Sequence, residues 1–151
     1  MFTGTLMLGL TLAVAADKPA QGAKEVTDAL SGYWDVTAAE RDGVPSKQRL
    51  PYTRLVFTGD RLTVTRVERP GEAKSPKEQN DARCKINPKS TGIEVTFLNG
   101  PDQQKTFYGV YEMNGDDLKV CWGENKDKRP TATSTEKGSG TLLLILKRGK
   151  P

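Results

Sequence analysis

The stretch that decides the fold is GVYEMNGDDLKVCW, residues 109–122. Asn114-Gly115 in its middle is the strongest short hairpin signal in the chain, because both residue types tolerate the positive φ of a tight hairpin turn. Apolar and polar residues alternate on either side of the turn, which is the period-two pattern of strands with one buried face. The sequence therefore predicts an antiparallel hairpin with strands over Thr106–Met113 and Leu118–Trp122.

Similar alternation recurs along the rest of the chain. Six further short strands are predicted, over residues 33–39, 54–58, 61–67, 82–87, 93–98 and 141–148. In the first of them, Trp34, Val36 and Ala38 would share one face. The connections leave no room for a crossover helix, so the strands should run antiparallel. We predict an all-β fold: an eight-stranded antiparallel up-and-down barrel, closed by pairing of its first and last strands, with a short N-terminal helical turn at 25–30.

The first 16 residues, MFTGTLMLGLTLAVAA, contain no charged side chain and end in the small-x-small pattern of a signal peptidase site. We expect residues 1–16 to be a signal peptide, residues 17–27 a mobile linker and residues 28–151 the barrel domain. The mature protein would then be exported, to the periplasm or outside the cell. No stable membrane insertion is expected after cleavage, because the apolar run is short for a transmembrane helix.

Composition excludes several kinds of chemistry. The 151-residue chain has no histidine, which removes Ser-His-Asp, Cys-His and His-ligated zinc sites. Its net charge is +4, but basic and acidic residues are interspersed, as in Lys126-Asp127-Lys128-Arg129. A nucleic-acid surface would gather its cations on one face, so no nucleic-acid partner is expected. No phosphate-binding or metal-binding motif occurs, and we expect no cofactor, no metal and no enzymatic activity.

An eight-stranded barrel is either just filled by side chains or holds one small ligand. In the first case the protein would act as a structural or protein-interaction module in the cell envelope. In the second it would bind a small apolar or amphipathic molecule, which is the function we predict. The residues expected to line such a site are Val36, Phe57, Val95, Tyr111, Val120 and Trp122.

Gly32-x-Trp34 opens the first predicted strand, and Arg148 ends the last one. If the barrel closes, these strands are neighbours, and Trp34 would plug one end of the barrel with the Arg148 guanidinium over its indole ring. Gly32 would let the backbone bend into the barrel end without a Cβ clash. The alternative is that Trp34 is an ordinary core residue and Arg148 a solvated charge.

The two cysteines are expected to be free. Cys84 shares the parity of Ile86 and should point inward, whereas Cys121 alternates with Val120 and Trp122 and should point outward. Their strands are also not neighbours in an up-and-down barrel, and a disulfide needs close, converging Cβ atoms. A bulge that shifted either parity would overturn this expectation.

Two further features have a functional and a plain interpretation. The carboxylates of Glu40, Asp42, Glu112 and Asp116-Asp117 could in principle do acid–base or calcium chemistry, but they lack the spacing of a calcium loop, and we expect them to serve turn formation and charge pairing instead. The long polar connection 123–140 could fold over the barrel mouth and bring Arg129 to it, or it could be a flexible connector.

Taken together, the run from Leu30 resembles a family of small exported lipocalin-like proteins of unknown function, numerous in planctomycete bacteria. The matching stretches are LSGYWDVTAAERDGVP (30–45), LVFTGDRLTV (55–64), KINPKSTGIEVTF (85–97), GVYEMNGDDLKVCW (109–122), RPT (129–131) and GSGTLLLILKR (138–148). The resemblance implies a lipocalin-like barrel in a secreted or envelope setting, without enzymatic activity and without a named ligand. Larger lipocalins cover the barrel wall with a C-terminal helix, so Leu143 and Ile145 would need another cover, either the 25–30 segment or a partner chain.

Overall fold

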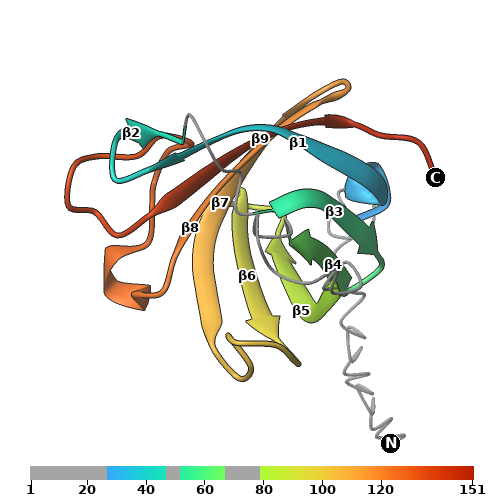
Figure 1. Ribbon diagram of the computed structural model, residues 1–151, viewed down its shortest axis with the longest axis horizontal. Coiled ribbons are helices and arrows are strands. Elements are labelled where there is room, and N and C mark those ends of the chain that lie inside the picture. The colour runs from blue at the N-terminus through green and yellow to red at the C-terminus, as the bar shows by residue number, and fades with distance from the viewer. Residues whose placement is uncertain (1–26, 47–51, 67–78) are drawn as a thin grey trace, which may run out of the picture.

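An antiparallel sheet closed on itself forms the body of the protein in the computed structural model, which describes residues 27–46, 52–66 and 79–151. Its strands are β1 (Gly32–Arg41), β2 (Val44–Pro45), β3 (Tyr52–Thr58), β4 (Arg61–Arg66), β5 (Gln79–Asn87), β6 (Gly92–Phe97), β7 (Thr106–Asn114), β8 (Asp117–Gly123) and β9 (Leu142–Arg148). A 3₁₀ turn, η1 (Lys126–Lys128), lies between β8 and β9. Figure 1 shows these elements wrapped around a common axis.

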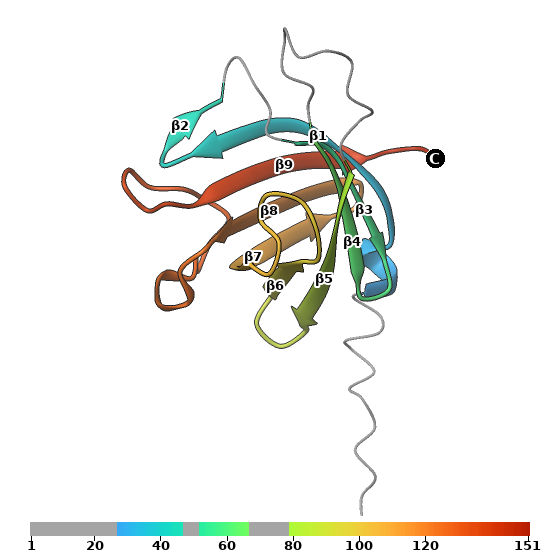
Figure 2. The same ribbon diagram turned by 60° about the horizontal axis from the view of Figure 1, so that its bottom comes forward.

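The prediction of a closed up-and-down barrel is confirmed. Every strand from β3 to β8 pairs with its successor, and β1 pairs with both β3 and β9. The closing ladder runs from Trp34 opposite Arg148 to Arg41 opposite Leu142, and both views of the ribbon show β1 and β9 side by side (Figure 2). The predicted helical turn is present at residues 27–30. The predicted signal peptide (1–16) and nearly all of the linker (17–27) lie outside the described residues.

One strand was not predicted. β2 extends β1 through a hairpin at Asp42 and Gly43, whose φ angles are 51° and 77°. Positive φ at two successive residues is the signature of a tight hairpin turn, and Asp-Gly is one of the pairs that favour it.

The side chains predicted to face inward on the first strand do so, with one exception. Trp34 and Val36 are buried in the barrel core, but Ala38 is exposed and Ala39 takes the buried position. The prediction that Ala38 shares the face of Trp34 is wrong because the β1–β9 register shifts between Val36 and Ala38. A bulge adds one residue to the strand, and this moves every later side chain to the opposite face.

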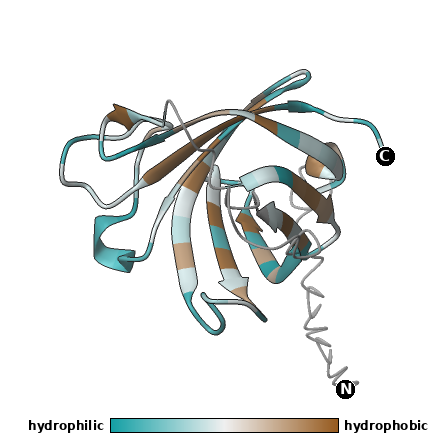
Figure 3. Ribbon diagram, viewed as in Figure 1, coloured by the Kyte–Doolittle hydropathy of each residue, from teal (hydrophilic) through white to brown (hydrophobic). Residues whose placement is uncertain are grey.

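β9 is apolar on both faces, unlike the other long strands. Leu142, Leu144 and Leu146 belong to the barrel core, whereas Leu143 and Ile145 belong to a second cluster on the outer wall. Figure 3 shows β9 as a nearly uniform apolar band, while β5 alternates between hydrophilic and hydrophobic residues. A continuous apolar run of this kind is typical of a strand that is covered on both sides.

The two ends of the barrel differ. At the closed end, on the right of Figure 1, the helical turn 27–30 lies beside the start of β1 and the end of β9. At the opposite end, the mouth, β3 and β7 begin and β1 and β8 end. The connection 124–141, between β8 and β9, starts and finishes at the mouth.

Candidate functional site

The closed end is built on a tryptophan–arginine stack. Trp34 is fully buried, and its indole Nε1 donates to the Leu30 carbonyl at 2.8 Å. The Arg148 guanidinium carbon lies 3.9 Å from the centre of the Trp34 ring. Its two Nη atoms donate to the carbonyls of Ser31 at 2.9 Å and Ala29 at 3.0 Å. Arg148 therefore ties the helical turn to both Trp34 and the last strand.

Gly32 is needed at this end for its backbone. Its φ is +115°, a region that residues with a Cβ atom rarely adopt. A Cβ atom at this position would lie 3.5 Å from Nη1 of Arg148, an ordinary van der Waals contact, so the φ angle rather than a clash requires glycine here. The Gly-x-Trp pattern thus corresponds to a backbone bend directly beneath the guanidinium.

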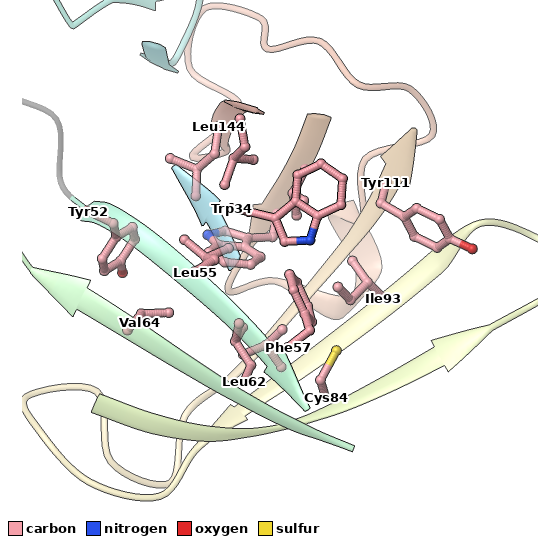
Figure 4. Packing of buried hydrophobic residues seen from close by; sticks show 14 of the residues in the cluster. Trp34, Tyr52, Leu55, Phe57, Leu62, Val64, Cys84, Ile93, Tyr111 and Leu144 are labelled. Atoms are coloured by element: carbon pink, nitrogen blue, oxygen red, sulfur yellow. The ribbon is translucent and has the colours of Figure 1, made fainter. Parts of the chain in front are cut away.

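The six residues predicted to line a ligand site all lie in one hydrophobic core: Val36, Phe57, Val95, Tyr111, Val120 and Trp122. They are packed against one another and against the rest of the core, with exposed fractions of 7% or less. Figure 4 shows Trp34 inside this cluster, with Tyr52 and Tyr111 at opposite sides of it. Of the six, Trp122 borders the pocket at the mouth described next, and Tyr111 borders a groove near the closed end.

The mouth holds a pocket of about 450 Å³ with an aromatic floor. Three rings line it: Tyr52 from β3, Phe107 from β7 and Trp122 from β8. The Trp122 ring centre lies 6.4 Å from that of Tyr52, edge to face, and 6.4 Å from that of Phe107. Trp122 is 2% exposed and Tyr52 is 7% exposed, whereas Phe107 is half-buried, so the three rings form a packed platform at the mouth.

Four charged side chains border the same pocket: Arg41, Asp102, Glu124 and Lys128. Both acids face Lys105, whose Nζ lies 3.2 Å from Asp102 and 3.6 Å from Glu124. Hydrogen bonding to Asp102 and the charge of Glu124 raise the pKa of Lys105 above its usual value. Neither Arg41 nor Lys128 forms an ion pair with a carboxylate of the described residues.

Arg129 does not reach the mouth. Its Nη2 donates to Glu94 on β6 at 2.6 Å, and its guanidinium lies 5.4 Å from the ring centre of Tyr108 on β7. Glu94 and Tyr108 alternate with inward residues and therefore point outward. The prediction that the connection brings Arg129 over the open end is wrong: Arg129 fastens the connection to the outer wall.

Residues 129–140, which we call the strap, are held to that wall by carboxylates. Three acids accept hydrogen bonds from the strap: Glu112 from Thr133 at 2.8 Å, Glu40 from Thr135 at 2.5 Å and Asp42 from the Gly140 N–H at 2.5 Å. Asp116 and Asp117 lie instead at the closed end, near Arg148 and Lys147 respectively. Three of the carboxylates noted in the sequence therefore hold the strap by hydrogen bonds, and the other two pair with basic side chains at the closed end.

The strap covers the outer apolar cluster of Val110, Cys121, Leu143 and Ile145. The Cys121 thiol lies 3.5 Å from the Ser134 carbonyl oxygen, and Leu143 is only 6% exposed. Sequence reasoning assigned this cover to the 25–30 segment or to a partner chain. That assignment is wrong, because the connection between β8 and β9 itself folds back over the wall.

Both cysteines are free and lie on opposite faces of the barrel wall. Burial, with a smaller contribution from the charge of Asp60, raises the pKa of Cys84 to about 12. Burial also raises the pKa of Cys121. Neither thiol has the lowered pKa of a nucleophilic cysteine.

A second hollow, the outer groove, has a volume of about 570 Å³. It runs from Ala29 of the helical turn along Val110 and Met113 of β7 to the strap at Thr131 and Thr133. Within the part of the chain that the structure describes, no group of three or more Cys, Asp or Glu side chains is placed to hold a metal ion. Over the same residues, no helix is long and apolar enough to cross a membrane.

Sequence reasoning missed most of the mouth. Tyr52 precedes a register shift between Tyr52 and Arg54, so it does not share the simple alternation of Leu55 and Phe57. Phe107 lies in the predicted strand over residues 106–113 but was not recognised as part of a site. Arg41 and Lys128 carry no local pattern at all, because only the fold brings β1 and η1 to the same rim.

Comparison with known proteins does not assign this chain to a family. No protein-family model and no curated protein matches the sequence. Two solved structures are similar. A lipocalin-like protein from Bacteroides uniformis ATCC 8492 has a TM-score of 0.49 at 12% identity, covering 80% of this chain and 98% of that one. An uncharacterized protein from Bacteroides eggerthii DSM 20697 has a TM-score of 0.46 at 14% identity, covering 78% and 98%. The fold assignment rests on the strand order and closure described above.

Proposed function

We propose that this protein is an exported, non-enzymatic lipocalin-like barrel that binds one small amphipathic molecule at its mouth. We further propose that it belongs with the small exported lipocalin-like proteins of planctomycete type. The observation that carries the binding proposal is the aromatic platform of Tyr52, Phe107 and Trp122 beneath a pocket of about 450 Å³. That volume falls within the roughly 300–1,000 Å³ of typical ligand pockets. Polar and charged groups make up more of the lining than the rings do, which suits an amphipathic rather than an apolar molecule.

The position of the pocket changes the expected binding mode. The next inward residues below the mouth are Leu55, Val120 and Leu144, and all three have no exposed surface. A ligand would therefore rest on the platform at the mouth rather than enter along the barrel axis. Export is supported by the apolar, uncharged residues 1–16.

The same filled interior favours a second candidate, a structural or protein-interaction module in the cell envelope. Its surface would not be the Leu143 and Ile145 wall, because the strap already covers Leu143. In this case the aromatic platform would only complete the core.

Native mass spectrometry separates the two candidates. Residues 17–151 would be produced by export and purified gently, beside a Trp122→Ala variant. A bound small mass that is released on denaturation and is lost in the variant would support a carrier. A bare monomer in both samples, or an adduct that Trp122→Ala retains, would refute binding at the mouth and favour the filled module. A Leu98→Ala variant, changed at an exposed apolar residue, is the matched control.

A further inference from the structure

We propose that the ligand of the mouth pocket is a compact aromatic anion. Its ring would rest on Tyr52, Phe107 and Trp122, and its acidic group would lie between Arg41 and Lys128. This inference rests on the proposed function, because it specifies the charge and shape of a molecule bound in the same pocket. Three features of the pocket carry it: its unbalanced cations, its aromatic floor and its closed base.

The charges at the rim favour an anion. Arg41 and Lys128 border the pocket and have no carboxylate partner among the described residues, whereas Asp102 and Glu124 share Lys105. The two acids are therefore already engaged, and the two cations are available. An incoming acidic group would meet charge-assisted hydrogen-bond donors at the rim, and the planar guanidinium of Arg41 suits a carboxylate, phosphate or sulfonate.

The floor favours a ring. Trp122 and Tyr52 are buried and meet edge to face, and Phe107 stands beside Trp122 at a tilt of 50°. Aromatic rings prefer edge-to-face and offset contacts with one another, so a further ring would add to an arrangement that already exists. A flexible aliphatic ligand would bury apolar surface on these rings but would make no edge-to-face or offset contacts with them.

The base of the pocket excludes a long chain. On three strands the residue directly below the rim faces a packed core: Leu55 on β3, Val120 on β8 and Leu144 on β9 have exposed fractions of 0%. Inserting an acyl tail would require these side chains to leave a close-packed interior, which costs energy that surface binding does not. The ligand is therefore compact and does not extend down the axis.

Two fluorescent probes with one aromatic frame test the inference. N-phenyl-1-naphthylamine is neutral, and 8-anilinonaphthalene-1-sulfonate is the same frame with a sulfonate. Each is titrated into residues 17–151 and into three variants: Arg41→Gln, Lys128→Gln and the control Lys126→Gln. Lys126 lies on the same 3₁₀ turn as Lys128 but does not border the pocket.

The anionic probe should bind more tightly than the neutral one. Arg41→Gln and Lys128→Gln should each raise the dissociation constant of the anionic probe about threefold, the effect of one exposed charge pair. Neither should change the neutral probe, and Lys126→Gln should change neither. Added salt should weaken only the anionic probe.

The remaining outcomes are distinct. If both probes bind equally and the charge variants change nothing, the anion inference is overturned and a mouth ligand still stands. If neither probe binds, both the anion inference and the proposed function are overturned. If Lys126→Gln weakens the anionic probe as much as Lys128→Gln does, the effect is a general surface charge and the assigned site is wrong.

Discussion

Replacing Arg148 with methionine should destabilise the barrel by about 2 kcal/mol. Methionine keeps an unbranched apolar stem over Trp34 and removes the guanidinium. The main lost contacts are two charge-assisted hydrogen bonds, to Ser31 and Ala29, and the stack on the indole ring. The ion pair with Asp116 is long, at 3.8 Å, and Asp116 is exposed, so its loss contributes little. The arginine side chain is 33% exposed, so each hydrogen bond is assigned about 0.5 kcal/mol rather than its full buried value. A cation over a buried tryptophan adds about 1 kcal/mol.

The neighbouring residue supplies a matched control. Lys147 lies on the same strand, points the other way and forms an ion pair with Asp117 at 2.9 Å. Both side chains of that pair are about two-thirds exposed (66% and 63%), so Lys147→Met should leave the free energy of unfolding close to that of wild type. The pair of variants therefore separates the closed-end stack from a general loss of positive charge.

Urea unfolding, followed by tryptophan fluorescence and by far-ultraviolet circular dichroism, measures both variants. The expected result is a lower midpoint for Arg148→Met with an unchanged slope, and a midpoint near wild type for Lys147→Met. Equal free energies of unfolding for the two variants would refute the reasoning, since Arg148 would then be only a solvated charge.

Two further predictions concern the strap and the thiols. Arg129→Met removes the contact with Glu94, so it should loosen the strap and speed labelling of Cys121 by N-ethylmaleimide several-fold, while the labelling rate of Cys84 stays unchanged. Lys126→Met is the control variant. Equal labelling rates of Cys121 in both variants would count against the strap as a cover. The pKa of Cys84 is raised from 9.0 to about 12, so above pH 9 the unfolded chain loses a proton that the folded protein keeps. Cys84 should therefore make stability fall by about 1.4 kcal/mol per pH unit between pH 9 and 12. Urea unfolding from pH 8 to 10.5 should show a shallower decline for Cys84→Ala, and parallel slopes for variant and wild type would contradict the burial effect.

Most of the barrel was predictable because its information is local. Alternation of apolar and polar residues identifies each long strand, and the Asn114-Gly115 turn fixes one hairpin. The short β2 strand was not predicted, since two residues carry too little pattern. Ala38 was misplaced because a bulge depends on how β1 fits against β9, which lies over 100 residues away in the sequence.

The candidate site was less predictable than the fold. Trp122 was identified because inward parity and a large ring are both visible in the sequence. Tyr52 was missed because a register shift hides its orientation. The strap was misread because its fastening is tertiary: Arg129 finds Glu94, and Thr135 finds Glu40, across long sequence separations. A polar connection gives no local sign of which surface it will cover.

The most direct test of a ligand site at the mouth uses the two tryptophans, which lie at opposite ends of the barrel. A ¹H–¹⁵N spectrum of residues 17–151 contains one indole signal from Trp34, at the closed end, and one from Trp122, beneath the pocket. During titration with 8-anilinonaphthalene-1-sulfonate, the Trp122 signal should move and saturate, while the Trp34 signal should stay in place. A Trp122 signal that stays fixed while amides of Val110 and Thr133 move would place binding in the outer groove and contradict the account.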